Sequence, residues 1–528
     1  MPTIHILETG RRITCAAGEN LLQVLHKAEV FIENPCNGTG VCGKCRVRIL
    51  DGEASPVHAT ERRLLTEGEI EKGIRLACLT QIIGDLDLEL PRSEQGNQML
   101  TGGYVPDFEH DAFAGGYGIA VDIGTTTVVA SLIDLRTGEE LASVSQINAQ
   151  KRFGLDVLTR ITYEYDHPEA GSHALQQAIV RQLDHLILQA CADGAADPIE
   201  IREVVVAANC TMTHMLLGVD ARPLGRSPYT PVFKAAQHLK CSEIGMESCK
   251  GAELYCLPQV SAYIGADIVA GTHVCRMTEE KGNVLFIDIG TNGEIVLASG
   301  GRLLCCSCAA GPALEGTNIS CGMRAADGAV EEISIGAEDT ELKVIGGGHA
   351  VGLCGSGILA AVRELLDKGY VKPSGVFIKK SESGLGADPR LLLQGVKRAF
   401  HLGGELIITQ DDVRQVQLAK GAILSGFMAL LHKAGIRMED LDKVLIAGQF
   451  GAHLPVDSLV GTGILPPQVR DKLVYVGNSS KTGAYMALLS QRERREMERL
   501  AEQMEYMELA ESENYESLFA GCMVFPKK

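Results

Sequence analysis

The chain has 528 residues, of which 45% are apolar and 22% are charged, which are ordinary proportions for a folded protein of about three or four domains. Lys and Arg number 49 against 67 Asp and Glu, giving a net charge of −18, and aromatic residues make up only 5%. A nucleic-acid backbone would be repelled by this charge, and bases would find few aromatic faces for stacking. We therefore expect no nucleic-acid partner.

The chain shows no pattern of membrane insertion or export. It has no run of about 18 apolar residues that could span a membrane, and residues 1–7 alternate like a strand instead of following the pattern of a signal peptide. We therefore expect a cytoplasmic protein. In a reducing compartment its 17 cysteines should be metal ligands or small buried side chains, not disulfides.

Residues 1–92 predict a small domain rich in strands. Residues 3–7 and 12–15 are typical of a hairpin, and Asn20 is a suitable cap for a helix over residues 21–28. A strand over residues 46–50 is expected to end at a turn at Asp51-Gly52. Residues 86–90 alternate apolar and acidic side chains, which predicts a half-buried strand.

Four cysteines in this region have the spacing of an iron–sulfur site. Cys36, Cys42 and Cys45 form C-x5-C-x2-C, and Cys78 follows after 32 intervening residues. A loop with three ligands and one distant fourth ligand is the ferredoxin arrangement, one residue longer here than the plant type. A zinc site would favour two C-x2-C pairs. The spacing predicts a [2Fe–2S] cluster, with zinc or plain buried thiols as the alternatives.

The chain changes character after the first domain. Residues 93–116 are rich in Gly and poor in periodic apolar residues, which predicts a linker. Beyond them, buried strands alternate with helices, which indicates an α/β architecture. The expected strands cover residues 118–130 (a strand, a turn and a second strand), 203–208, 283–297 and 443–447. The expected helices cover residues 175–191, 358–366 and 491–509.

One strand-and-turn motif occurs twice. IAVDIGTTTV at residues 119–128 is echoed by LFIDIGTNGE at residues 285–294, a separation that suits two similar domains facing each other. After each strand a Gly permits a tight turn, which can present hydroxyl and N–H groups to phosphate oxygens. The Asp of each copy, Asp122 or Asp288, can hold Mg²⁺ through water or orient an attacking water. One such turn can be a simple hairpin, but two matching copies favour function.

The predicted phosphate-binding residues are Gly124, Thr125, Thr126, Thr127, Gly290, Thr291, Asn292 and Gly293. A third strand with a glycine-rich turn, at residues 444–451, is expected to contact adenosine through Gly448 and Gln449. The glycines of residues 352–358 suit close packing of a helix between the lobes. No Walker P-loop is present.

Together these loops resemble those of the actin, sugar and acetate kinase and heat-shock chaperone superfamily, in which two duplicated domains clasp ATP and Mg²⁺. With a ferredoxin domain in front, the chain resembles the reductive activators of corrinoid proteins. Residues 153–157, 209–214, 307–312 and 319–323 add to this resemblance. It implies a β-grasp ferredoxin-like domain at 1–92, a linker at 93–116 and two ATPase lobes at 117–275 and 276–528, the second including a C-terminal helix.

The resemblance also implies an activity. The cluster would pass one electron to Co(II) of a corrinoid methyl-carrier protein, giving Co(I), and ATP would drive this uphill step. The expected partners are that protein and a low-potential electron donor, and a homodimer is suggested. The main alternative is a redox-sensing small-molecule kinase of the same fold. A 2-hydroxyacyl-CoA dehydratase activator would lack the N-terminal cysteines, and a plain electron carrier would not need phosphate loops.

Five further residues remain without an assigned role. Cys305, Cys306, Cys308 and Cys321 could suggest a second cluster, but neighbouring strand residues point to opposite faces, so buried thiols are the simpler interpretation. His214 is expected to be a core histidine. A role as lower axial ligand of cobalt stays open.

Overall fold

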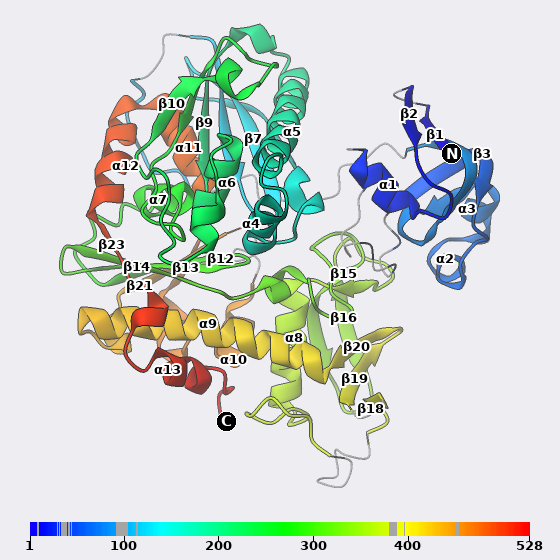
Figure 1. The fold of residues 1–528 in the computed structure, drawn as a ribbon. Coiled ribbons are helices and arrows are strands. Elements are labelled where there is room, and N and C mark those ends of the chain that lie inside the picture. The colour runs from blue at the N-terminus through cyan, green and yellow to red at the C-terminus, as the bar shows by residue number, and fades with distance from the viewer. Residues whose placement is uncertain are drawn as a thin grey trace.

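The computed structural model describes residues 1–528 except 8, 9, 29, 31, 33–37, 39, 41, 42, 44, 91–103, 112–114, 380–387, 395, 396, 449–453 and 528. Within the described part, one five-stranded sheet and two six-stranded sheets follow one another along the chain (Figure 1). Two three-stranded sheets complete the C-terminal half. No helix of the described residues is long and apolar enough to cross a membrane.

The N-terminal sheet has the strand order β2-β1-β5-β3-β4. Its strands are β1 (Thr3–Ile6), β2 (Arg11–Thr14), β3 (Arg46–Ala54), β4 (Ile74–Leu76) and β5 (Ile82–Glu89), and its helices are α1 (Leu21–Lys27), α2 (Ala59–Leu64) and α3 (Glu67–Glu71). The predicted cap is confirmed, because the Asn20 side chain accepts a hydrogen bond from the Gln23 amide at 3.2 Å. The apolar side of α1 joins the core of this sheet, which is the expected β-grasp ferredoxin-like fold.

One predicted strand end in this sheet is wrong. β3 does not stop at Asp51-Gly52 but continues to Ala54, with irregular register on both sides of Gly52 against β5. Gly52 has a φ of +113°, and a Cβ there would lie 1.9 Å from the Asp85 carbonyl oxygen. Gly52 therefore serves a close approach between paired strands, which a turn signal in the sequence cannot reveal.

The second sheet has the order β10-β11-β9-β6-β7-β8. Its strands are β6 (Tyr117–Ile123), β7 (Thr127–Asp134), β8 (Glu140–Ile147), β9 (Ile201–Ala208), β10 (Gln237–Lys240) and β11 (Glu253–Cys256), and its helices are α4 (Val157–Asp166), α5 (Gly171–Asp193), α6 (Cys210–Leu216) and α7 (Ala266–Val274). The predicted helix over residues 175–191 lies within α5. The predicted strand over residues 203–208 lies within β9.

The third sheet repeats this pattern in the order β22-β21-β12-β13-β14-β23. Its strands are β12 (Val284–Ile289), β13 (Gly293–Ser299), β14 (Arg302–Cys308), β21 (Lys443–Ala447), β22 (Leu473–Gly477) and β23 (Met504–Tyr506). In both sheets the first strand pairs antiparallel with the next one in the chain and parallel with a later strand (β9 or β21). The duplicated, two-lobed fold is therefore confirmed.

Further helices belong to the C-terminal half of the chain. They are α8 (Gly355–Asp367), α9 (Gln410–Ala434), α10 (Val456–Gly461), α11 (Ser479–Leu489), α12 (Gln491–Gln503) and α13 (Tyr515–Cys522). The small sheets contain β15 (Ala329–Ile335), β16 (Thr340–Val344), β17 (Gly352–Leu353), β18 (Leu391–Gln394), β19 (Lys397–Gly403) and β20 (Leu406–Thr409). One apolar core combines α7 and α11 with strands of both large sheets, while α9 lies along the third sheet (Figure 1).

Two helix predictions need correction. α12 ends at Gln503 instead of continuing to residue 509, because residues 504–506 pair in parallel with β14 and complete the edge of the sheet. α8 begins at Gly355, before the predicted start at residue 358, and its glycines approach the short helix Pro312–Glu315 and strand β15, both in the C-terminal half of the chain. A Cβ on Gly355 would lie 2.1 Å from the Leu314 carbonyl oxygen, and one on Gly357 would lie 2.0 Å from that of Val330.

The described part of the expected linker contacts the C-terminal half of the chain. The Tyr104 amide donates to the Val476 carbonyl at 3.1 Å, and the Asp111 amide donates to the Leu489 carbonyl at 3.0 Å. The Asp111 carboxylate in turn accepts from the Gln491 amide at 2.6 Å. Residues 104–111 are thus fastened beside α11 and α12.

Candidate functional site

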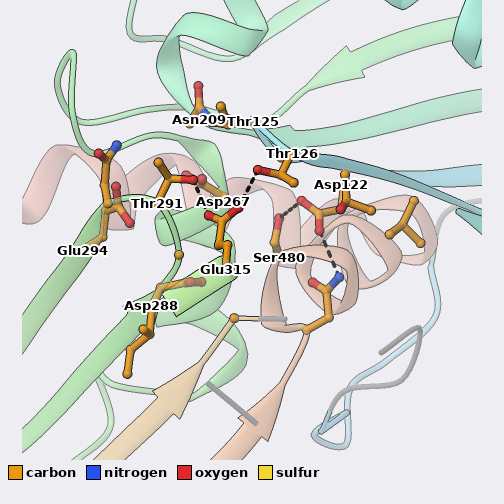
Figure 2. A pocket seen from close by; sticks show the side chains of 18 residues that line it. Asp122, Thr125, Thr126, Asn209, Asp267, Asp288, Thr291, Glu294, Glu315 and Ser480 are labelled. Carbon is orange, nitrogen blue, oxygen red and sulfur yellow. Dashed lines mark hydrogen bonds between the residues drawn. The ribbon is translucent and has the colours of Figure 1, made fainter. Parts of the chain in front are cut away.

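Two turns face each other across a cleft between the second and third sheets (Figure 2). One joins β6 to β7, where the Gly124 amide donates to the Thr127 carbonyl at 2.9 Å. The other joins β12 to β13, where the Gly290 amide donates to the Asn292 carbonyl at 2.9 Å. Residues from the sequence prediction that line this cleft are Asp122, Gly124, Thr125, Thr126, Thr127, Asp288, Gly290, Thr291, Asn292 and Gly448.

Two predicted residues are not among those that line the cleft. Gly293 is buried in β13, where a Cβ would lie 2.8 Å from the Cys308 sulfur, so its small size serves packing between neighbouring strands. Gln449 lies outside the described residues. Its neighbour Gly448 has a φ of +91°, and a Cβ there would lie 2.5 Å from an Asp288 carboxylate oxygen. Only glycine lets this turn approach Asp288 so closely.

Six further polar residues line the cleft that were not predicted from the sequence. They are Asn209, Asp267, Glu294, Glu315, Asn478 and Ser480. Glu294 is the last residue of the second copy of the repeat, and Asn209 follows a buried strand. For these two residues, the sequence nearby could have indicated a place at the site. The remaining four come from segments with no phosphate-loop pattern, and the fold alone brings them here.

Asp122 is held by the start of α11. Its carboxylate accepts hydrogen bonds from Asn478 Nδ2 at 2.9 Å and Ser480 Oγ at 2.8 Å (Figure 2). Asn478 also caps the helix, because its Oδ1 accepts from the Lys481 amide at 2.9 Å. A residue of the second sheet is therefore oriented by side chains more than 350 positions later in the sequence.

Carboxylates gather at the cleft at a high electrostatic cost. Burial, followed by repulsion from Asp267 and Asp122, raises the pKa of Asp288 to about 8. Burial also raises the pKa of Asp267 to about 7 and that of Glu294 well above its ordinary value. Such a site favours protons or a cation, because each lowers the repulsion.

These carboxylates suit a cation that also binds phosphate. Among the described residues, the one group of three or more potential ligands with atoms within 4.8 Å of one another is His273, Glu493 and Glu496, which lies on α7 and α12. The cleft carboxylates are farther apart and so could not enclose an ion by themselves. Mg²⁺ commonly binds one or two carboxylates together with substrate phosphates and water, and the donor set of the cleft fits that mode.

The His273 group is occupied by protein contacts. Glu493 accepts from His273 Nε2 at 2.5 Å and from Arg276 Nη1 at 2.8 Å. Despite the cost of burial, these hydrogen bonds lower the pKa of Glu493 to about 2. The group is a buried ion-pair network that joins two helices.

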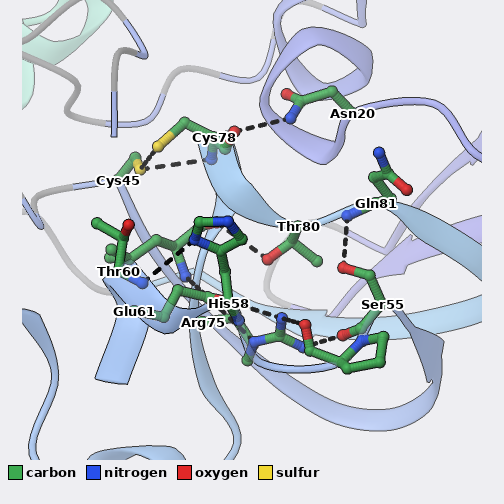
Figure 3. Close-up of polar contacts among 12 residues, drawn as sticks. Asn20, Cys45, Ser55, His58, Thr60, Glu61, Arg75, Cys78, Thr80 and Gln81 are labelled. Atoms are coloured by element: carbon green, nitrogen blue, oxygen red, sulfur yellow. Dashed lines mark hydrogen bonds and ion pairs between the residues drawn. The ribbon is translucent and has the colours of Figure 1, made fainter. Parts of the chain in front are cut away.

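The second candidate centre lies in the N-terminal sheet (Figure 3). The sulfurs of Cys45 and Cys78 are 3.1 Å apart, and the Cys78 amide points to the Cys45 sulfur at 3.5 Å. Asn20 Nδ2 fixes the Cys78 carbonyl at 2.8 Å. Two thiols this close, with an N–H directed at sulfur, fit ligands of one iron–sulfur cluster. Cys36 and Cys42 lie outside the described residues.

A buried ion pair supports this centre. Arg75 Nε and Nη2 donate to Glu61 Oε1 and Oε2, both at 2.9 Å (Figure 3). Glu61 also accepts from the Leu76 amide at 2.9 Å, so α2 is fastened to the backbone two residues before Cys78. Although burial opposes ionisation, the Arg75 hydrogen bonds keep the pKa of Glu61 below its ordinary value.

Comparison with known proteins agrees with both centres. Residues 4–82 match the 2Fe-2S iron-sulfur cluster binding domain, residues 117–280 the RACo middle region, and residues 282–528 the C-terminal domain of RACo, the ASKHA domain. Corrinoid activation enzyme RamQ of Eubacterium limosum is 35% identical over 410 residues, covering 75% of this chain and 68% of the relative. The chain belongs to the family of reductive activators of corrinoid proteins.

Two further similarities support membership of this activator family. The [Co(II) methylated amine-specific corrinoid protein] reductase of Methanosarcina barkeri is 26% identical over 400 residues, covering 69% of this chain and 68% of the relative. A solved structure, the reductive activator for corrinoid,iron-sulfur protein, has a TM-score of 0.70 and 29% identity. That comparison covers 100% of this chain and 98% of the other.

In this activator the turn between β6 and β7 is held in place by two buried side chains. Asn148 Nδ2 donates to the Gly124 carbonyl at 2.8 Å, and the Asn148 amide donates to the Thr126 carbonyl at 2.9 Å. Arg160 Nη2 donates to the Thr125 carbonyl at 2.5 Å. Both side chains are fully buried, so the loop is fixed before any ligand binds.

His214 is a core residue, as expected from the sequence. Its Nδ1 bonds the Cys210 carbonyl at 2.8 Å, and its Nε2 accepts from the Val232 amide at 3.1 Å. The ring also stacks on Phe233. Because Nδ1 must donate and Nε2 must accept, the imidazole is neutral with both nitrogens occupied, which removes it as a cobalt ligand in this conformation.

The cysteines of β14 are buried thiols. Cys305 belongs to the core shared by both large sheets, and Cys306 and Cys308 to the core on the opposite face of the third sheet. The predicted alternation is therefore confirmed. Cys321, at the edge of that second core, contacts the Glu405 carbonyl, and no metal-ligand group among the described residues includes it.

Proposed function

We propose that this activator uses ATP to drive the transfer of one electron from a [2Fe–2S] cluster to Co(II) of a corrinoid protein, giving Co(I). The observation that carries the proposal is the presence in one chain of two centres. One is the Cys45–Cys78 pair in a ferredoxin-like sheet, and the other is a cleft between two opposed phosphate loops. The names of the relatives, a corrinoid activation enzyme and a Co(II) corrinoid protein reductase, support it.

In the nucleotide cleft, the chain's own groups would bind and orient Mg²⁺ and ATP. The turns at residues 124–127 and 290–293 offer N–H and hydroxyl donors to the phosphates. Asp122 and Asp288 would hold Mg²⁺ through water, or orient the water that attacks the terminal phosphate. Gly448 lines the cleft, and it would let adenosine approach the backbone of the second lobe, with Gln449 as the second contact that the sequence predicts.

In the N-terminal domain, Cys36, Cys42, Cys45 and Cys78 would hold the cluster. When bound, a [2Fe–2S] cluster supplies one electron at low potential, near about −400 mV in plant-type ferredoxins. Each further 59 mV toward a lower-potential acceptor costs about a factor of ten in a one-electron equilibrium. Energy from ATP would offset this cost, and a separate low-potential donor would restore the electron.

The proposed division of the chain is a cluster domain at 1–92, a linker at 93–116, a first lobe at 117–275 and a second lobe at 276–528. Separate apolar cores in the first domain and in each lobe support it. The core that combines α7 and α11 with both sheets would let events at one loop reach the other lobe. A homodimer is proposed on family resemblance and is tested by the mass of the chain in solution.

The experiment is an anaerobic absorbance titration of the full chain. The reduced protein is mixed with a Co(II) corrinoid protein, with and without Mg·ATP. The proposal expects a bleachable [2Fe–2S] spectrum and Co(I) formation that depends on ATP. A reducible cluster with ATP hydrolysis but no electron transfer to any corrinoid protein would instead favour a redox-sensing small-molecule kinase. Absence of a cluster would refute the proposal.

A further inference from the structure

Glu315 connects the two phosphate loops across the cleft. Its Oε2 accepts a hydrogen bond from the Thr126 hydroxyl at 2.9 Å, and its Oε1 accepts one from the Thr291 hydroxyl (Figure 2). Thr126 belongs to the turn of the second sheet and Thr291 to the turn of the third sheet. The carboxylate, only 5% exposed, is therefore a direct polar link between the two halves of the nucleotide site.

This link competes with a nucleotide for the same protons. A threonine hydroxyl has a single hydrogen to donate, so Thr126 and Thr291 cannot donate to Glu315 and to phosphate oxygens at the same time. A phosphate group would also be repelled by the adjacent carboxylate. A phosphate that accepts hydrogen bonds from both hydroxyls must therefore displace Glu315.

A cationic side chain with an unsatisfied buried donor lies within electrostatic reach of this carboxylate. Arg324 Nη1 is buried and has no hydrogen-bond partner among the described residues. Burial lowers the pKa of Arg324, and the charge of Glu315 is the interaction that opposes this effect. An unsatisfied buried guanidinium donor is costly, and a carboxylate is the acceptor that suits it best.

The backbone keeps Glu315 and Arg324 close and leaves room for Glu315 to move. Gly316 follows Glu315 with a φ of +78°, and a Cβ there would lie 2.4 Å from the Met323 carbonyl oxygen. This contact places Arg324 beside the short helix Pro312–Glu315. On the other side of that helix, Gly311 has a φ of +75° and open space around its Cβ position, as a hinge requires.

We propose that Glu315 is a latch that reports the terminal phosphate of a nucleoside triphosphate. It ties the two phosphate loops together in the empty cleft, and the terminal phosphate displaces it from the two threonines onto Arg324. Loss of that phosphate by hydrolysis lets Glu315 return to the two threonines. This inference rests on the proposed function only in that the cleft binds ATP, and it assigns Glu315 and Arg324 as positioning residues.

The test measures nucleotide selectivity in the full, cluster-loaded chain by calorimetry with Mg·AMP-PNP and Mg·ADP. Glu315→Gln keeps the shape but removes the charge, so AMP-PNP should bind about tenfold more tightly while ADP changes less than about twofold. Arg324→Gln should weaken AMP-PNP about tenfold and spare ADP, and Arg324→Lys should restore most of the loss. Glu332→Gln, an exposed residue of the same lobe, is the matched control and should change neither.

The double variant gives the sharpest readout. If Arg324 acts only by receiving the displaced carboxylate, Arg324→Gln should have no effect once Glu315 is Gln, so the double variant should match Glu315→Gln alone. Weaker AMP-PNP binding by Glu315→Gln would overturn the latch and mark Glu315 as a ligand of Mg²⁺. A loss from Arg324→Gln that persists in the double variant would overturn it in favour of direct phosphate binding by Arg324. Failure of the unaltered chain to bind any nucleotide would instead refute the ATP step of the proposed function.

Discussion

Arg494 on α12 provides a severe test of how the two lobes are held together. Its guanidinium donates from Nη1 to Glu203 Oε1 at 2.8 Å and from Nη2 to Glu203 Oε2, and the two side chains are 6% and 3% exposed. Arg494 Nε also donates to the Ala487 carbonyl at 2.5 Å, and the guanidinium lies 4.6 Å from the Tyr255 ring centre. Glu203 is on β9, so this buried pair joins the C-terminal segment to the second sheet.

Arg494→Met should destabilise the chain by about 3–5 kcal/mol, because it leaves the Glu203 carboxylate buried without its partner. For a unit of 150–250 residues, each kcal/mol corresponds to a shift of about 2–4 °C in Tm. We therefore expect the transition of the lobe that contains Glu203 to fall by about 6–20 °C. Differential scanning calorimetry of the anaerobic, full-length chain measures it.

Two variants separate this effect from general damage to α12. Adding Glu203→Gln to Arg494→Met removes the unpaired charge and should recover part of the lost stability. Arg492 lies on the same helix and is 60% exposed in its pair with Glu496, so Arg492→Met should change stability by less than about 0.5 kcal/mol. Equal losses from Arg492→Met and Arg494→Met, or a double variant less stable than the single one, would refute the reasoning.

Four further outcomes follow from the two centres and their surroundings. Asp288→Asn should reduce ATP hydrolysis at least about a hundredfold, measured as phosphate release. It should not lower Tm, measured by calorimetry, because it removes a carboxyl group whose ionisation burial disfavours. Cys78→Ser should abolish the [2Fe–2S] absorbance while leaving nucleotide binding intact, and a cluster that persists would contradict the ligand assignment. Asn148→Ala removes the hydrogen bond to the Gly124 carbonyl and should weaken AMP-PNP binding about tenfold, as measured by calorimetry. Unchanged affinity would show that the turn keeps its conformation without this hydrogen bond. Burial raises the pKa of Glu164 from 4.5 to about 7. The stability that this group contributes is therefore present at acid pH and is lost as the pH rises through 7, by up to about 3 kcal/mol. Glu164→Gln should flatten the fall in Tm between pH 5 and pH 8, and parallel Tm curves for the two proteins would contradict this.

Features that depend on a local pattern could be predicted without the structure. Each strand of the repeated motif is a buried apolar run followed by a Gly turn, and both properties are visible in ten consecutive residues. The spacing of Cys36, Cys42 and Cys45 is equally local. The alternation of Cys305 and Cys306 between two cores followed from the two-residue period of a strand.

The distant groups that complete the site, in contrast, are known only from the folded chain. Asn478 and Ser480 reach Asp122 from more than 350 positions away, and Glu315 bonds threonines of both lobes. The end of α12 and the continuation of β3 through Gly52 likewise depend on a partner strand that supplies hydrogen bonds. Backbone pairing and side-chain convergence are set by the packing of whole sheets, and a one-dimensional pattern of apolar and polar residues does not contain that information.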